Sequence, residues 1–568
     1  MSYDLRREPW IPWRRRSGVV DWGPPAALVS RLDDDPVVAI AAPRPDFDGA
    51  LQEFLIGLLS AALQPADEKA WRALWTEPPS VEALQTALDA LPDAFDLDGD
   101  GPRLFQDLST IDFATCDPKP IDQLLIDSPG DQGISLNKDL FVKRARVERM
   151  SRPVAAMALV TLQTYAPSGG QGHRTSMRGG GPLTTLIDPR GDGPDGMRAE
   201  DQPLWLALWA NVETRAQLAE RAIAGGDSPG GVFPWLATTR TSDLKKGGVS
   251  TTPADGHPLQ VYFGIPRRIR LAFGECGRCD MTDRDDDRTV SGFSTINYGV
   301  KYDRWIHPLS PHARSKVSEP WGPLRGQPSG VAWRDWLSLT LDAPGDEGLR
   351  VPAKCVSHFA NRRAAPAGRR EFLVRVFGYD MDNMKARGWI QAILPAFAIE
   401  GQRRSLLYAA ARSFVEATNI AAGALLFAVR TALFRNPSEA RGELGQVKLE
   451  LWSETESTFF DAIRALADDG LDDEQVAEHI EQVRRDFLPR LERAALAVFD
   501  RWSPTGGLDV DAIRRRVAAR YGLASTLRGY SKFGEQIFAA LGLAPPGGGR
   551  AARAATKSRT SKPKEKTK

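Results

Sequence analysis

The last third of the chain carries the pattern that most constrains the fold, an apolar stripe whose members recur every three or four residues. The stripe consists of Leu406, Ala410, Phe414, Ala417, Ala421, Leu425, Ala428 and Ala432. An α-helix brings residues at this spacing onto one face. Three further helical patterns follow at about 447–468, 473–502 and 509–541. Four long helices joined by short connections are typical of a four-helix bundle, and we expect the stripe to form its core.

Residues 1–388 lack such long patterns, and clusters of turn residues interrupt them repeatedly, in a chain with 51 Gly and 41 Pro. Between the clusters lie short helical patterns at Leu51–Leu63 and Val81–Leu91, and strand-like pieces at Gln260–Phe263, Ile269–Phe273 and Phe372–Phe377. The predicted fold class is α+β: a large irregular α/β N-terminal domain with long loops over 1–388, plus a C-terminal four-helix bundle over 389–544. Long loops in folded domains often carry function.

Charge is distributed unevenly along the chain. Residues 550–568 contain eight Lys/Arg and one Glu, a formal +7, which leaves −6 for the rest of a chain whose total is +1. The composition of 545–568 predicts a disordered basic tail. A body of negative net charge is expected to bind nucleic acid only through a local basic patch. Four cysteines and an N-terminus without an apolar segment predict a cytoplasmic protein.

One loop, residues 166–181, is rich in glycine and reads APSGGQGHRTSMRGGG. Glycine adopts positive φ and lets a backbone approach a ligand closely, and successive N–H groups in such turns bind anions. His173, Arg174 and Arg178 add donors and positive charge. This combination suits contact with a phosphate backbone or a groove edge. A flexible surface loop of the same composition is the alternative interpretation.

A second segment, Gly378–Arg387, follows a strand-like run, and we expect a helix after it. Its polar and basic side chains, suited to base edges and phosphates, are Asp382, Asn383, Lys385 and Arg387. Its unbranched apolar side chains, Met381 and Met384, are suited to wedging between stacked bases. The alternative interpretation is a polar strand-to-helix turn whose methionines lie in the core.

Metal and catalytic motifs are sparse. Cys276-Gly-Arg-Cys279 is half of a zinc site, because structural zinc needs four ligands and the chain has no second CxxC pair; a turn with two free thiols is the alternative. None of the six histidines stands in a hydrolase motif, so we predict no enzyme activity. Two alternatives stay open: a metal-dependent nucleic-acid hydrolase using His307, His312 and Asp283–Asp287, and a scaffold that binds only protein.

Four short stretches, in order along the chain, resemble the CasA family, the large subunit of the type I-E CRISPR Cascade surveillance complex. They are Glu8-Pro-Trp-Ile-Pro12, His173–Thr185, Trp305–Pro311 and Gly378–Arg387. The resemblance implies an irregular N-terminal domain, a four-helix bundle and no catalytic site. It also implies recognition of the protospacer-adjacent motif (PAM) in duplex DNA from the minor groove, and opening of the duplex to start R-loop formation. Implied partners are the guide RNA 5′ handle, target double-stranded DNA, the backbone, handle-binding and small Cascade subunits, and a helicase–nuclease, with no membrane.

The resemblance also assigns residues to DNA binding. The PAM loop corresponds to Gly170, Gln171 and Gly172, and His173 and Arg174 follow it. The wedge that splits base pairs corresponds to Asp382, Asn383 and Met384, and Lys385 follows it. A basic finger of other members falls near Asn297, which is uncharged. We expect Lys301, four residues on, to supply the charge. This departure implies a different or looser PAM preference.

A further loop, residues 135–152, matches the family's contact with the RNA handle and DNA. Phe141 corresponds to its stacking residue. Its basic side chains are Lys138, Lys143, Arg144, Arg146 and Arg149. The second cysteine pair that completes zinc in some relatives falls near Ser151 and Val154, so neither zinc nor another cofactor is expected.

Overall fold

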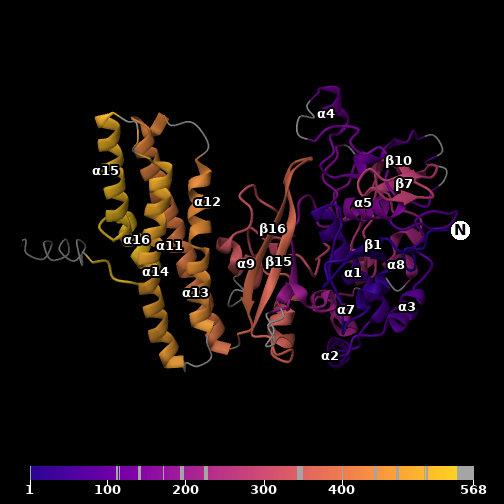
Figure 1. The fold of residues 1–568 in the computed structure, drawn as a ribbon, viewed down its shortest axis with the longest axis horizontal. Coiled ribbons are helices and arrows are strands. Elements are labelled where there is room, and N and C mark those ends of the chain that lie inside the picture. The colour runs from indigo at the N-terminus through magenta and orange to yellow at the C-terminus, as the bar shows by residue number, and fades with distance from the viewer. Residues whose placement is uncertain are drawn as a thin grey trace, which may run out of the picture. The chain divides into compact units, whose positions relative to one another are not determined.

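The computed structural model shows two compact units, drawn in Figure 1. It describes residues 2–109, 113, 116–137, 142–170, 172–191, 198–222, 228–341, 349–399, 401–439, 444–467, 473–504, 506 and 509–546. The first unit comprises Met1–Val331 with Ser338–Ala398, and the second comprises Ala332–Leu337 with Ile399–Lys568. Helices and strands are mixed and the C-terminal region is helical, so the α+β class is confirmed. The predicted tail falls almost wholly outside the described residues.

Helices alone build the long C-terminal part of the second unit (Figure 1). They are α11 (Gly401–Leu433), α12 (Gly445–Glu454), α13 (Glu456–Ala467), α14 (Asp473–Trp502), α15 (Val510–Leu527) and α16 (Lys532–Ala540). All four predicted helical patterns are present. The second is divided at Thr455, and the fourth is divided around Gly529, whose φ of +91° does not continue a helix.

The bundle core forms along α11, as the stripe predicted. Seven of its eight residues are buried; Leu406 is half-buried, and its neighbour Leu407 takes the core position. Phe414 packs on Phe487, with ring centroids 4.6 Å apart. Residues Arg403–Leu433 of α11 are long and apolar enough, by length and composition, to cross a membrane. Because α11 packs against α12, α14, α15 and α16, we interpret it as the core helix of the bundle.

A short segment from the middle of the chain, Ala332–Leu337, belongs to the same core. The Trp333 ring stacks on Phe459 at 4.3 Å, and its indole N–H donates to the Trp452 carbonyl at 2.8 Å. The sequence pattern did not indicate this insertion. The predicted boundary after residue 388 is also wrong, because strand β16 (Lys385–Phe397) belongs to the first unit and the chain enters the second unit after Ala398.

The first unit surrounds two buried helices, α1 (Pro45–Leu63) and α5 (Arg152–Tyr165), which pack together. Its other helices are α2 (Glu68–Thr76), α3 (Val81–Asp89), α4 (Asp131–Ser135), α6 (Leu204–Trp209), α7 (Arg215–Arg221), α8 (Pro229–Val232) and α10 (Lys354–His358); α9 (Trp336–Thr340) begins in the second unit and ends in the first. The predicted helices in 51–63 and 81–91 are therefore confirmed.

Small sheets pack around these helices. Among the described residues, four of them have three strands each. The first consists of β2 (Val20–Gly23), β1 (Ile11–Arg15) and β3 (Val37–Ile40), and the second of β4 (Lys119–Pro120), β10 (Val290–Ile296) and β7 (Arg268–Phe273). The third consists of β16, β15 (Glu371–Asp382) and β5 (Thr184–Asp188), and the fourth of the two-residue strands β13 (Gly322–Pro323), β12 (His312–Ala313) and β14 (Arg350–Val351). Other short strands are β6 (Ser250–Thr251), β8 (Gly277–Arg278), β9 (Asp285–Asp286) and β11 (Lys301–Tyr302).

Two of the three predicted strands are confirmed, as β7 and β15. The third, Gln260–Phe263, is wrong, because residues Pro258–Tyr262 form a 3-10 helix. Pro258 presets a helical φ at its first position, and the His257 ring accepts the Leu259 N–H at 3.1 Å, which caps the turn.

Candidate nucleic-acid interface

The segment predicted as a wedge is the tip of a long antiparallel hairpin, β15–β16 (Figure 1). The expected helix after residue 387 is wrong: Asp382 pairs with Lys385, and only Asn383 and Met384 form the turn. Asn383 has φ +53°, a left-handed conformation that asparagine tolerates better than most residues. All four residues are exposed, and the Met384 side chain is 53% exposed. An apolar, unbranched side chain therefore projects at the tip beside one lysine.

The base of the tip is braced by Arg387. Its Nε and Nη2 donate to the Asp380 carboxylate at 2.8 and 2.7 Å, and its Nη1 lies 3.6 Å from Asp382. These carboxylates pair with the guanidinium, so Arg387 stiffens the hairpin; its side chain is 45% exposed, and the phosphate contact predicted for it stays a prediction. Lys385, with its exposed side chain, keeps that role as a prediction.

The glycine loop needs its glycines. Gly170 and Gly172 have φ of +87° and +82°. A Cβ at Gly172 would lie 2.7 Å from the Asn297 Cβ, and the Tyr298 N–H donates to the Gly172 carbonyl at 2.7 Å. The structure thus brings the predicted PAM loop onto the predicted Asn297 position, although they lie far apart in sequence. Gln171 lies outside the described residues.

Two predicted cations follow these contacting residues in the chain, Arg174 two positions after Gly172 and Lys301 four positions after Asn297. The Arg174 Nε donates to the Ser242 hydroxyl at 2.7 Å, its Nη2 donates to the Ser242 carbonyl at 3.1 Å, and its guanidinium lies 5.9 Å from the Tyr298 ring centre. Arg174 therefore holds the loop to the segment that carries Tyr298. Lys301, in β11, is exposed. His173 donates its backbone N–H to the Gly170 carbonyl at 3.3 Å, which closes the turn.

A buried polar cluster, which sequence reasoning missed, anchors the far end of the glycine loop. Its centre is Glu53 of α1, which accepts from Tyr165 at 2.6 Å, from Thr184 at 2.7 Å and from Arg178 at 2.7 Å. Arg178 also donates to Ser310 at 3.0 Å. Because the Arg178 and Glu53 side chains are each 3% exposed, the expected contact of Arg178 with a ligand is wrong. The only sequence signal was a glutamate within an apolar helix.

The cluster joins segments that lie far apart in sequence. Burial and the neighbouring Glu53 carboxylate raise the pKa of Tyr165 well above its usual value. The His307 ring lies 3.8 Å from Glu53, and burial lowers the pKa of His307 well below its usual value. Both groups are therefore neutral near pH 7, and Glu53 and Arg178 form the charged pair of the cluster.

The loop and the hairpin are connected through Gly181. It has φ +68°, and a Cβ there would lie 2.9 Å from the Met381 Cγ and 2.8 Å from the Tyr379 carbonyl. The strand that follows the loop, β5, pairs with β15. Gly172 precedes Gly181 by nine residues, so the loop tip lies within roughly 30 Å of the strand that leads to the wedge. The glycine loop therefore leads into a strand of the sheet that carries the hairpin.

The basic loop is described in part, because Lys138 and Phe141 lie outside the described residues. The described cations Lys143, Arg144, Arg146 and Arg149 are exposed. Backbone N–H groups of residues 148 and 149 donate to the Asp280 carboxylate at 2.7 and 2.8 Å, and Met150 is buried, pairing with Val290. The loop is therefore held by its backbone and presents its cations outward.

Among the described residues, no group of three or more His, Cys, Asp or Glu is placed to hold a metal ion. Cys276 is exposed and Cys279 is buried, at either end of strand β8. Ser151, which stands near the position of the second cysteine pair of some relatives, lines the same hollow as Cys276. Arg152 in that hollow forms an ion pair with Asp286. In the described part of the chain these side chains do not fit a four-ligand zinc site.

The alternative hydrolase constellation is not assembled. His307 and His312 are buried, whereas Asp283 is exposed and pairs with Arg278 of the β8–β9 hairpin at 3.2 Å. Burial lowers the pKa of His312 to about 4. The structure thus gives the two histidines and the aspartate run different surroundings.

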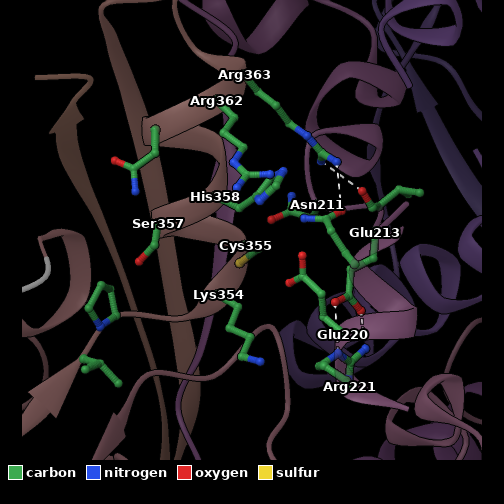
Figure 2. Close-up of a pocket in the computed structure, with 15 residues that line it drawn as sticks. Asn211, Glu213, Glu220, Arg221, Lys354, Cys355, Ser357, His358, Arg362 and Arg363 are labelled. Carbon is green, nitrogen blue, oxygen red and sulfur yellow. Dashed lines mark hydrogen bonds and ion pairs between the residues drawn. The ribbon is translucent and has the colours of Figure 1, made fainter. Parts of the chain in front are cut away.

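A separate cavity of about 360 Å³ lies between α7 and α10 (Figure 2). Most of its charged groups pair with one another or with Glu68: Arg221 donates to Glu213, while Arg363 and His358 contact Glu68 at 2.9 and 2.8 Å. Figure 2 shows Lys354 and Arg362 projecting from the α10 side, and both are exposed. The paired charges mark the cavity wall as a structural network.

The comparisons with known proteins agree with this architecture. The sequence profile of the family described as CRISPR-associated protein Cse1 matches residues 4–498. The chain belongs to this family. A comparison with curated protein sequences finds no match.

Solved structures share the fold. Thermobifida fusca Cse1 has a TM-score of 0.68 at 18% identity, over 96% of this chain and 99% of that chain. Thermus thermophilus CasA (Cse1) has a TM-score of 0.64 at 18% identity, over 92% and 99%. A chain of a CRISPR RNA-guided surveillance complex has 0.64 at 16%, over 92% and 99%. The two names CasA and Cse1 designate one protein, so the predicted CasA resemblance is confirmed.

Proposed function

We propose that this chain is the non-catalytic large subunit of a type I-E CRISPR Cascade complex, and that it reads the PAM in duplex DNA and opens the adjacent base pairs. Membership of the Cse1 family supports the subunit role. The observation that carries the DNA-opening step is the hairpin tip, where exposed Asn383 and Met384 stand on two long paired strands. An exposed methionine on a braced hairpin suits insertion between base pairs, which costs a few kcal/mol per unstacked step.

The glycine loop supplies the reading element in this proposal. In this proposal the exposed turn at Gly170 offers backbone groups to the DNA, and Gly172, which is buried, fixes that turn against Asn297. Backbone donors and an uncharged amide distinguish bases poorly in the minor groove, so we expect several PAM sequences to be accepted. Guide pairing would then supply most of the sequence specificity, as in other RNA-guided effectors.

The basic loop completes the proposed interface. The outward cations of 143–149 form the local basic patch that a chain with an acidic body needs, and we propose the guide RNA 5′ handle and target DNA as their ligands. Other Cascade subunits and a helicase–nuclease are the proposed protein partners, in the cytoplasm.

The test compares duplex targets that are fully paired with targets already opened beside the PAM. In the assembled complex, Asn383→Ala with Met384→Ala should weaken binding to the paired target and leave binding to the opened target unchanged. Val19→Ala, at a side chain of similar exposure (56%) in another turn, is the matched control. Equal weakening for both targets, or none, would refute the wedge.

A further inference from the structure

A second cavity, of about 340 Å³, lies between the start of α1 and the middle of the β15–β16 hairpin. Its apolar wall is formed by Ile40, Pro45, Leu204, Phe377, Trp389 and Ile393. The Phe377 and Trp389 rings stack with centroids 5.7 Å apart. A cavity of this volume, with apolar walls and a few polar groups, has the form of a small-molecule site.

One polar group in the wall, Arg375, is weakly compensated. Its side chain is 34% exposed, and its Nη1 lies 3.7 Å from the Asp188 carboxylate. That carboxylate already accepts two hydrogen bonds of 2.8 Å from Arg190. Burial lowers the pKa of Arg375, and the nearby carboxylates of Asp188 and Asp48 offset only part of that effect. An anion in the cavity would supply the missing partner.

Two more groups line the same space. The Trp389 ring contributes apolar surface to the cavity. Asp48 of α1 accepts the Ala42 N–H at 3.0 Å, and burial raises the pKa of its carboxyl group to about 7. Asp48 is therefore only partly ionised near neutral pH and repels an incoming anion less than an ordinary carboxylate would.

We propose that this cavity binds a small anion with an apolar body, a carboxylate or phosphate monoester attached to an aromatic or aliphatic group. The anionic head lies against Arg375, and the body packs on Phe377 and Leu204. Because Pro45 and Asp48 of α1 and residues of both hairpin strands line this cavity, a ligand that fills it links the middle of the hairpin to α1. The proposal does not depend on DNA recognition.

The test is a calorimetric titration of the full-length protein with benzoate, with phenyl phosphate and with neutral benzamide. We expect saturable binding of both anions and at least tenfold weaker binding of benzamide. Arg375→Gln should weaken both anions by about tenfold or more, the loss of one charge-assisted contact. Lys354→Gln, which removes an exposed cation from the cavity of Figure 2, should leave binding unchanged.

A second variant keeps the test independent of Arg375. Gln391 lines the cavity from an exposed position, so Gln391→Trp should fill the space and abolish binding while the chain stays folded. The proposal is overturned if neither anion binds saturably to the wild type, if benzamide binds as well as benzoate, or if the Gln391→Trp variant retains full affinity.

Discussion

Replacing Glu53 with glutamine tests whether the buried cluster holds the glycine loop in place. The substitution keeps the shape of the side chain and removes its charge. Glu53 accepts three hydrogen bonds of 2.6 to 2.7 Å, and its partner Arg178 is equally buried. In Glu53→Gln the Arg178 guanidinium would stay buried without a compensating carboxylate.

The expected cost follows from that uncompensated charge. Removing one partner of a buried ion pair destabilises a protein by about 3–5 kcal/mol, because the remaining charge keeps its desolvation penalty. Replacing both partners, as in Glu53→Gln with Arg178→Gln, should cost less than the sum of the two single changes, since no charge is then left buried. The exposed pair Arg278–Asp283 provides the control, and Asp283→Asn should cost under about 1 kcal/mol.

Urea unfolding followed by tryptophan fluorescence measures these differences, since most of the 15 tryptophans lie in the first unit. The variant should unfold at a lower urea concentration, and the assembled complex should bind PAM-containing duplex more weakly. A loss of under about 1 kcal/mol in Glu53→Gln, equal to that of the exposed control, would show that the cluster does not depend on its charges.

Three further predictions follow from single positions. Burial lowers the pKa of His312 from 6.5 to about 4, so between these pH values the unfolded state binds more protons than the folded state. Acidification from pH 6.5 to 4 should therefore remove roughly 3 kcal/mol of folding stability. Urea titrations at several pH values measure this loss, and His312→Asn should abolish that part of the pH dependence. Gly172→Ala should lower both the folding stability and the DNA affinity, because the new Cβ would lie 2.7 Å from the Asn297 Cβ. Gly170→Ala is the control, because Gly170 has a similar φ but open space around it, and it should cost only the backbone strain of about 1 kcal/mol. Equal effects of the two substitutions would contradict the close contact at Gly172. Arg146→Gln should reduce the salt dependence of nucleic-acid binding by about one phosphate contact, and an unchanged slope in binding isotherms at several salt concentrations would remove Arg146 from the interface.

Local patterns determined much of the bundle. The stripe along α11 recurs with the period of a helix, and that period depends only on residues a few positions apart. Tertiary structure decided the finer choice of Leu407 over Leu406 as a core residue, because the neighbouring helices set which side of the helix is covered. It also decided the insertion of Trp333, whose partners lie more than a hundred residues away.

The hairpin shows the opposite case. A helix was expected after Arg387, but residues 388–397 continue strand β16, whose partner β15 is itself paired with β5, about 190 residues earlier. The pairing of β15 with β5 joins residues far apart in the chain, so no local pattern specifies that contact.

The candidate interface also combines features that the sequence predicts with contacts that only the folded chain makes. Motif resemblance identified the glycine loop and the Asn383–Met384 tip from the sequence, because short loops carry their own residue requirements. Only the folded chain brings Gly172 against Asn297, and only the fold pairs Arg178 with Glu53 and Arg387 with Asp380. The sequence gives the charge of each side chain. The partner that compensates this charge depends on the packing of the whole unit, because that packing decides which side chains come into contact.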